Sequence, residues 1–185
     1  MDTLGWVMII AVLVVLAGVA WFLTKRARTR ALQRDFGPEY DRTMARSGDR
    51  GVAESDLRER RERVGALHVR PLSRSDHDRF ATEWTKVQAA FVDAPAEAVS
   101  DADQLIQQVM VTRGYPVQDF DRRAADVSVE HPDVVENYRS AHSIALKEAR
   151  QDADANTEAL RKAMVYYRSL FEELLVVDDG SDRRN

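Results

Sequence analysis

The apolar positions of this chain form a continuous run at the N-terminus and a periodic pattern afterwards. The run Leu4–Leu23 contains no charged residue. As a helix with a rise of about 1.5 Å per residue it covers about 30 Å, the thickness of a bilayer's hydrocarbon core. Trp6 and Trp21 lie near its two ends, and indole rings prefer the membrane interface. The run therefore predicts a transmembrane anchor over residues 1–24, with the lipid bilayer as its partner.

Two other interpretations of this run stay open. A buried core helix is one, although such helices seldom extend over twenty uncharged residues. A cleaved signal peptide is the other, because the small residues at 18–20 have a suitable spacing for cleavage. A signal peptide needs basic residues before its apolar stretch, however, and only Asp2 precedes this one. We therefore expect the run to be retained.

Basic residues follow the run directly, namely Lys25, Arg26, Arg28 and Arg30. Because Lys and Arg near a membrane segment are held on the cytoplasmic side, we expect a single-pass membrane protein, N-terminus out and C-terminal domain cytoplasmic. The opposite orientation is the alternative. We place the four residues at the membrane surface, where they either bind anionic lipid or act only as a topology signal.

After the anchor the apolar residues recur every three or four positions, which is the period of an amphipathic helix. One such stripe consists of Phe80, Trp84, Val87 and Phe91. A second runs from Ala98 to Met110, in a helix that we expect to end near Gly114, and a third includes Leu160, Met164, Tyr167, Phe171 and Leu174. No segment alternates as a strand would. The pattern predicts an all-α fold: an N-terminal transmembrane helix followed by a small bundle of about five to six helices.

Local signals divide this helical region. Pro38 interrupts a helix near Gly37, and the segment 47–51 forms a break. Ser73 is placed to cap a helix, and Pro95 suits a first helical position. We expect a basic juxtamembrane segment and linker over 25–52, the bundle domain over 53–178, and a disordered tail over 179–185.

Acidic and basic residues of the segment 53–64 pair at a spacing of four, as in Glu54 with Arg58, Asp56 with Arg60, and Glu59 with Arg63. This spacing supports a helix. Because each arginine has a nearby carboxylate, we interpret the segment as a solvated helix face rather than a nucleic-acid site. A helix that begins at His131–Pro132 is also expected.

The charge is unevenly distributed along the chain. Residues 25–74 hold 14 Lys or Arg against 8 Asp or Glu, whereas residues 75–185 hold 13 against 22. Phosphate binding needs a concentrated basic face, so nucleic acid is not expected as a partner. The absence of cysteine excludes disulfides, thiol nucleophiles and cysteine zinc sites.

No catalytic or cofactor motif is present. The segment 152–156 begins like a calcium loop, but Thr157 stands where the loop needs glycine and Ala163 where it needs a closing Glu. There is no G-x-G phosphate loop and no G-x-S-x-G elbow. We therefore expect no enzymatic activity, no cofactor and no metal.

Five short segments carry a family resemblance: F-G-P-E-Y-D-R at Phe36–Arg42, R-P-L at Arg70–Leu72, F-V-D-A-P at Phe91–Pro95, R-G-Y-P at Arg113–Pro116, and H-P-D-V-V-E-N-Y-R at His131–Arg139. Through them the chain resembles, from the anchor to about Leu175, a family of uncharacterised single-pass membrane or "secreted" proteins of high-GC bacteria. The resemblance implies an anchored helical domain and supplies no catalytic residues.

These observations favour a membrane-tethered, non-enzymatic helical interaction module with an unknown protein partner. If the domain contacts a partner, we expect the contact at Arg113, Tyr115 and Phe120. The rings of Tyr115 and Phe120 lie outside the regular apolar stripes. The alternative at this turn is that both rings close the core. For the whole domain, the alternatives are a binding module for a small apolar or lipid ligand and an unrecognised enzyme.

Overall fold

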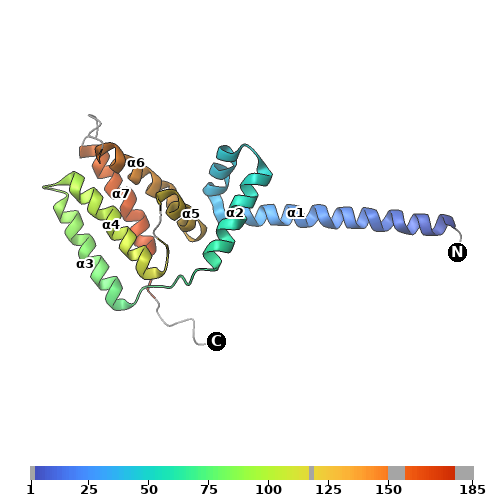
Figure 1. The fold of residues 1–185 in the computed structure, drawn as a ribbon, viewed down its shortest axis with the longest axis horizontal. Coiled ribbons are helices and arrows are strands. Elements are labelled where there is room, and N and C mark those ends of the chain that lie inside the picture. Colours follow the sequence, from blue (N-terminus) through green and yellow to red (C-terminus); the bar gives the residue numbers. More distant parts are fainter. Residues whose placement is uncertain (1–2, 117–118, 150–156, 178–185) are drawn as a thin grey trace. The chain divides into compact units, whose positions relative to one another are not determined.

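The structure, a computed structural model, describes residues 3–116, 119–149 and 157–177, with side chains from Val12 onward except at Ala149. These residues form seven α-helices and no strand (Figure 1). The helices are α1 Thr3–Ser47, α2 Arg50–Gly65, α3 Arg74–Ala90, α4 Pro95–Arg113, α5 Phe120–Glu130, α6 Val135–Ala149 and α7 Thr157–Leu174. The predicted all-α fold is confirmed for this part of the chain.

The chain divides into two compact units, Met1–Arg58 and Glu59–Asn185. The first unit contains α1 and the first part of α2, and the second contains the remainder of α2 with α3 to α7. The division falls within α2, whereas the predicted bundle domain begins at residue 53.

Helix α1 carries the predicted break at Gly37. This glycine has φ 43° and ψ −124°, which lie outside helical geometry and separate two helical stretches that meet at a kink. Pro38 follows directly and cannot donate a main-chain hydrogen bond, so the ladder is interrupted where the sequence predicts it. The second stretch ends at Ser47, and Gly48 turns the chain with φ 67°.

In the first unit the carboxylate of Glu54 connects α1 to α2. Its Oε1 atom accepts hydrogen bonds from Thr29 Oγ1 at 2.8 Å, Tyr40 Oη at 3.2 Å and Arg50 Nε at 3.0 Å. Desolvation opposes ionisation of Glu54, but these hydrogen bonds outweigh it and lower the pKa of the carboxyl. The expected pair of Glu54 with Arg58 is wrong in its detail, because Arg58 Nε donates to the main-chain oxygen of Glu54.

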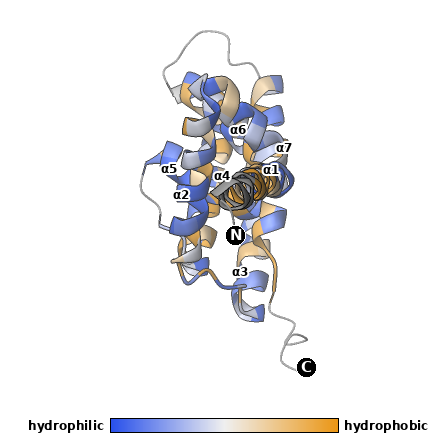
Figure 2. Cartoon of the chain, turned by 90° about the vertical axis from the view of Figure 1, so that its right-hand side faces the viewer, coloured by the Kyte–Doolittle hydropathy of each residue, from blue (hydrophilic) through white to orange (hydrophobic). Residues whose placement is uncertain are grey.

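The second unit is built around α4 and α7. Helix α7 packs against α4 and α6, α3 packs against α4, and α5 packs against α6. The predicted stripes supply the core: Phe80 and Trp84 are buried, and the Trp84 ring stacks on Phe171 with centroids 4.4 Å apart. Figure 2 shows hydrophobic and polar residues alternating along these helices, as amphipathic packing requires.

Several predicted helix ends are confirmed. Ser73 Oγ accepts a hydrogen bond from the Asp76 main-chain N–H at 3.1 Å, and Pro95 opens α4. Gly114 ends α4 in the left-handed conformation with φ 98°. A side chain there would place its Cβ atom 2.8 Å from the main-chain oxygen of His68, so both the dihedral and the space require glycine. The predicted start of the next helix at His131 is wrong, because His131 caps the end of α5 and α6 begins at Val135.

Within the described residues, none of the helices combines the length and the hydropathy needed to cross a membrane. The side chains of the first part of the predicted anchor, before Val12, lie outside these residues. The calcium-loop-like segment 152–156 and the predicted tail 179–185 also lie outside them.

Candidate functional site

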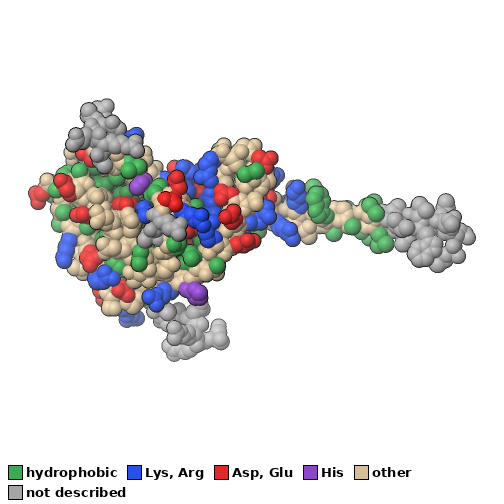
Figure 3. All heavy atoms as spheres, viewed as in Figure 1, with side chains coloured by type: hydrophobic (Ala, Val, Ile, Leu, Met, Phe, Trp, Pro, Cys, Tyr) green, Lys and Arg blue, Asp and Glu red, His purple; other side chains and the backbone are tan. Residues whose placement is uncertain are grey.

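Apolar side chains on α1 are exposed along the described part of the predicted anchor. Their exposed fractions extend from 50% at Val19 to 66% at Val14 and Trp21. They are Val12, Leu13, Val14, Val15, Leu16, Val19, Trp21, Phe22 and Leu23. Since the series includes consecutive positions, the exposure extends around the helix, unlike the single apolar stripe of a surface helix. Figure 3 shows green apolar side chains along this stretch, followed by a blue group of cations.

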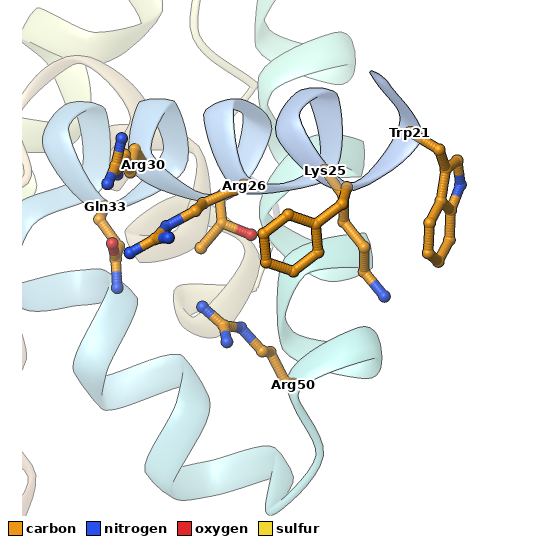
Figure 4. A pocket seen from close by; sticks show the side chains of 8 residues that line it. Trp21, Lys25, Arg26, Arg30, Gln33 and Arg50 are labelled. Atoms are coloured by element: carbon orange, nitrogen blue, oxygen red, sulfur yellow. The ribbon is translucent and has the colours of Figure 1, made fainter. Parts of the chain in front are cut away.

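The cations at the end of this stretch line a pocket of about 540 Å³ in the first unit, here called the basic pocket. Its lining residues are Trp21, Phe22, Lys25, Arg26, Thr29, Arg30, Gln33 and Arg50. All but Arg50 lie on α1. Figure 4 shows the labelled side chains arranged along α1 from Trp21 to Gln33, with Arg50 entering from α2. Aromatic rings, those of Trp21 and Phe22, therefore lie at one end of the pocket, and basic side chains lie further along α1.

The charges of the basic pocket differ in their partners. Lys25 Nζ lies 5.2 Å from the centroid of the Trp21 ring, within reach of a cation–π interaction. Arg50 forms an ion pair with Glu54 at 3.0 Å while 60% of its side chain stays exposed. In the described part of the chain, no carboxylate pairs with Arg26 or Arg30. The pocket therefore offers guanidinium groups to a ligand.

Of the predicted membrane-surface residues, the structure brings together Lys25, Arg26 and Arg30, whereas Arg28 does not line the pocket. Arg50 was not predicted. Its position depends on the turn after Gly48 that returns α2 to α1, and a cluster of basic residues along the sequence does not reveal such a turn.

The predicted contact residues Arg113 and Tyr115 are almost fully buried, with exposed fractions of 6% and 3%. Tyr115 Oη donates a hydrogen bond to Glu130 Oε2, and Arg113 Nη2 lies 3.8 Å from the same oxygen. Arg113 Nε also donates to the main-chain oxygen of Arg70 at 3.3 Å. This burial favours the interpretation in which the turn closes the core, and contact with a partner here stays a prediction.

His131 lies beside this cluster. Its Nδ1 atom is 3.4 Å from Glu173 Oε2, and its Nε2 atom is 3.5 Å from Arg113 Nη1. Burial and the Arg113 charge lower the pKa of His131 despite the neighbouring carboxylates. The imidazole is therefore neutral at pH 7.

Phe120, the third predicted contact residue, is half-buried at the start of α5. Its ring stacks on the His142 imidazole with centroids 3.7 Å apart and an interplanar angle of 6°, and it lies 5.0 Å from the Tyr138 ring. Burial lowers the pKa of His142. Phe120 thus packs a neutral histidine against the bundle.

A second pocket, of about 530 Å³, opens between α4, α6 and α7 and is here called the acidic cleft. Its lining combines apolar side chains with Glu97, Asp103, His142, Glu148 and Tyr167. Gln107 Nε2 donates to Asp103 Oδ2 at 2.6 Å. Among the described residues, Asp103 Oδ1 and the fully buried Tyr167 hydroxyl make no well-formed hydrogen bond, although the Asp103 carboxylate lies close enough to interact with that hydroxyl. Burial and the Asp103 charge raise the pKa of Tyr167, so its hydroxyl stays a donor.

The expected solvated face of α2 is wrong for two of its arginines. Arg60 is 2% exposed, and its Nη1 atom lies 3.4 Å from Ser128 Oγ. Arg63 donates to Asp126 Oδ1 at 2.8 Å, and the Asp126 side chain is only 1% exposed. A local acid–base spacing gives no information about a carboxylate more than sixty residues away, so the sequence did not reveal this contact between α2 and α5.

No group of three or more His, Asp or Glu side chains in the described ranges is arranged to hold a metal ion. No known protein family, curated protein or solved structure matches the chain. The resemblance to bacterial single-pass membrane proteins accordingly stays a prediction, and the features that bear on function are the two pockets and the exposed apolar helix.

Proposed function

We propose that this chain is a membrane-tethered helical interaction module in which Leu4–Leu23 crosses a bacterial cell membrane once and the helical body lies in the cytoplasm. The observation that carries the proposal is the exposed apolar surface of α1 between Val12 and Leu23. Exposure of so many large apolar side chains is costly in water and favourable in lipid. Lys25, Arg26, Arg28 and Arg30 then lie at the cytoplasmic surface.

Membrane fractionation tests the tether. The full chain is expected in the membrane pellet after extraction at alkaline pH. A Val14→Arg/Leu16→Arg variant places two charges in the middle of the span, where each costs about 2.5–3.5 kcal/mol, and it should shift to the supernatant. The control Val111→Arg/Val165→Arg changes two comparably exposed residues of the body and should stay in the pellet. Alkaline extraction of the unaltered chain would overturn the tether.

A reporter pair fused at the C-terminus, one active only in the cytoplasm and one only outside it, tests the orientation. We expect activity from the cytoplasmic reporter. Activity from the other reporter would reverse the orientation and change the class of partner. Crosslinking in the native membrane then tests the interaction, and failure to recover any reproducible partner would contradict the role as an interaction module.

The acidic cleft favours a second candidate function, a binding module for a small ligand. Its lining is mixed rather than purely apolar, so the matching ligand is an organic amine with a short alkyl chain rather than a hydrocarbon. The ammonium group donates hydrogen bonds to Asp103 Oδ1 and to the hydroxyl oxygen of Tyr167, the two buried atoms that make no well-formed hydrogen bond among the described residues.

Hexylamine is a suitable probe for the acidic cleft. It should raise the melting temperature of the unaltered chain and of Asp101→Asn, which removes an exposed carboxylate from the same helix. It should not stabilise Asp103→Asn. An equal shift in both variants, or no shift in the unaltered chain, would exclude this site.

A further inference from the structure

We propose that the basic pocket binds the phosphate of an anionic phospholipid, whose acyl chains lie along the apolar surface of α1. This inference depends on the proposed membrane tether and adds a specific ligand to it. The site consists of the guanidinium groups of Arg26, Arg30 and Arg50 beside the rings of Trp21 and Phe22.

Apolar and basic side chains follow one another along α1 in the order in which a phospholipid carries its acyl chains and its phosphate. The exposed apolar residues end at Leu23, and the basic lining begins at Lys25. From Phe22 to Arg26 the helix rises only about 6 Å. A lipid whose phosphate lies in the pocket therefore has its acyl chains beside the exposed apolar side chains. Trp21 stands at the level where indole rings of membrane proteins contact headgroups.

Two of the lining guanidinium groups are available to an anionic ligand. Arg26 and Arg30 have no carboxylate partner within the described residues, so they bind a phosphate without first breaking an ion pair. Guanidinium groups match a phosphate with two parallel hydrogen bonds, which an ammonium group does not provide. The amide of Gln33 at the far end of the pocket adds a further donor.

Arg50 is held in place at the pocket by other side chains of the first unit. Its Nε atom donates to Glu54, and Glu54 is fixed in turn by Thr29 and Tyr40. Glu54 is thus a positioning residue that directs Arg50 to the pocket, while most of the Arg50 side chain stays exposed. Cations that only set the orientation of a membrane helix act from the segment beside that helix. An arginine contributed by a second helix is typical of a site that surrounds a ligand.

Other phosphate-bearing ligands fit less well. Nucleic acid requires an extended basic face, and this pocket has four cations beside an apolar helix. A free phosphate ester leaves the aromatic side of the pocket without a role. The arrangement of aromatic, apolar and basic groups matches a ligand with a phosphate and two hydrocarbon chains.

Lipid retention by the full chain in neutral detergent micelles, measured by native mass spectrometry, tests the inference. Phosphatidylglycerol should be retained in preference to phosphatidylcholine. Arg26→Gln/Arg30→Gln removes two lining cations, and with about fivefold per cation the affinity for phosphatidylglycerol should fall about 25-fold. The control Arg28→Gln/Arg34→Gln removes the same charge from two positions that do not line the pocket, and it should weaken retention clearly less than the lining variant does.

Arg50 provides the sharper comparison. Arg50→Gln should weaken phosphatidylglycerol retention about fivefold, whereas Arg58→Gln, an exposed arginine of α2 outside the pocket, should not. Glycerol 3-phosphate, which has the phosphate without acyl chains, should compete only weakly. Equal losses in the lining and control variants would overturn the site, and competition by glycerol 3-phosphate as effective as by the lipid would indicate a soluble phosphate ester instead.

The two proposals fail in different ways. Release of the unaltered chain from membranes at alkaline pH contradicts the tether. A chain that stays in the membrane but retains phosphatidylglycerol no better than phosphatidylcholine contradicts only the basic pocket.

Discussion

Replacing Arg63 by methionine removes the cation that faces a buried carboxylate while keeping a long apolar side chain. Arg63 and Asp126 join the end of α2 to α5 within the second unit, at a nitrogen–oxygen distance of 2.8 Å. The Asp126 side chain is 1% exposed, Arg63 contacts its Oδ1 atom, and its Oδ2 atom has no hydrogen-bond partner in the described part. The substitution therefore leaves a carboxylate inside the protein without its counter-ion.

Burial sets the size of the effect. Removing one partner of a fully buried ion pair costs about 3–5 kcal/mol, because the remaining charge is left uncompensated. The Arg63 side chain is 22% exposed, so water hydrates part of the pair, and we expect a cost at the lower end, about 3 kcal/mol. In a unit of this size that corresponds to a fall in melting temperature of roughly 10 °C.

Arg168 and Glu172 provide a matched control on α7. Their nitrogen–oxygen distance is 2.7 Å, but 56% and 58% of the two side chains are exposed. Arg168→Met should change the stability by no more than about 1 kcal/mol, as exposed pairs do. The two variants thus compare similar distances at different burial.

Thermal unfolding of the full chain in a mild neutral detergent, followed by circular dichroism, measures both variants. The double variant Arg63→Met/Asp126→Asn should recover part of the loss, because a neutral amide is less costly to bury than a carboxylate. If Arg63→Met lowers the melting temperature no more than Arg168→Met does, the pair behaves as a solvated surface contact and the reasoning from burial is wrong.

Three further predictions use the same measurement. The pKa values of His131 and His142 are lowered in the folded state, so below about pH 6.5 the unfolded chain binds more protons and the stability present at pH 7.5 is progressively lost. The melting temperature should fall between pH 7.5 and 5.5, and the fall should be smaller in the variant His131→Gln/His142→Gln. If the variant and the unaltered chain lose the same number of degrees over this pH range, the assignment to these two histidines is wrong. Gly114→Ala should cost at least about 1 kcal/mol, whereas Gly65→Ala, which has open space and no positive φ, should not destabilise, and equal effects would contradict the conformational argument. Tyr115→Ala should cost about 3–5 kcal/mol and Tyr115→Phe about 1 kcal/mol, and an unaltered melting temperature with loss of a crosslinked partner would instead assign this ring to recognition.

Local signals predict the fold well where neighbouring residues decide the conformation. The cap at Ser73, the start of α4 at Pro95 and its end at Gly114 depend on the chemistry of a few adjacent residues. The apolar stripes are likewise read from spacing alone, because a helix face repeats with a fixed period. His131 shows the limit, since its hydrogen bond to Val127 ends one helix where the proline beside it suggested the start of another.

The candidate sites are less predictable because they bring together residues that are distant in the sequence. Asp103, His142 and Tyr167 come from three helices and meet only when α4, α6 and α7 pack. Arg50 reaches the basic pocket through the turn after Gly48. Spacing rules describe neighbours on one helix, and they do not report which faces of different helices meet.

Two sets of arginines in the described part of this chain differ in what faces them. Arg63, Arg113 and Arg123 are largely buried, and each lies near a carboxylate, a tyrosine or a main-chain oxygen, since a buried cation without partners is too costly. Arg26 and Arg30 are exposed and have no such partner in the described part, and they lie immediately after the apolar surface of α1. Structural requirements therefore account for the first group and not for the second. Under the tether that we propose, a position at the membrane surface beside anionic lipid is the role that we assign to the second group.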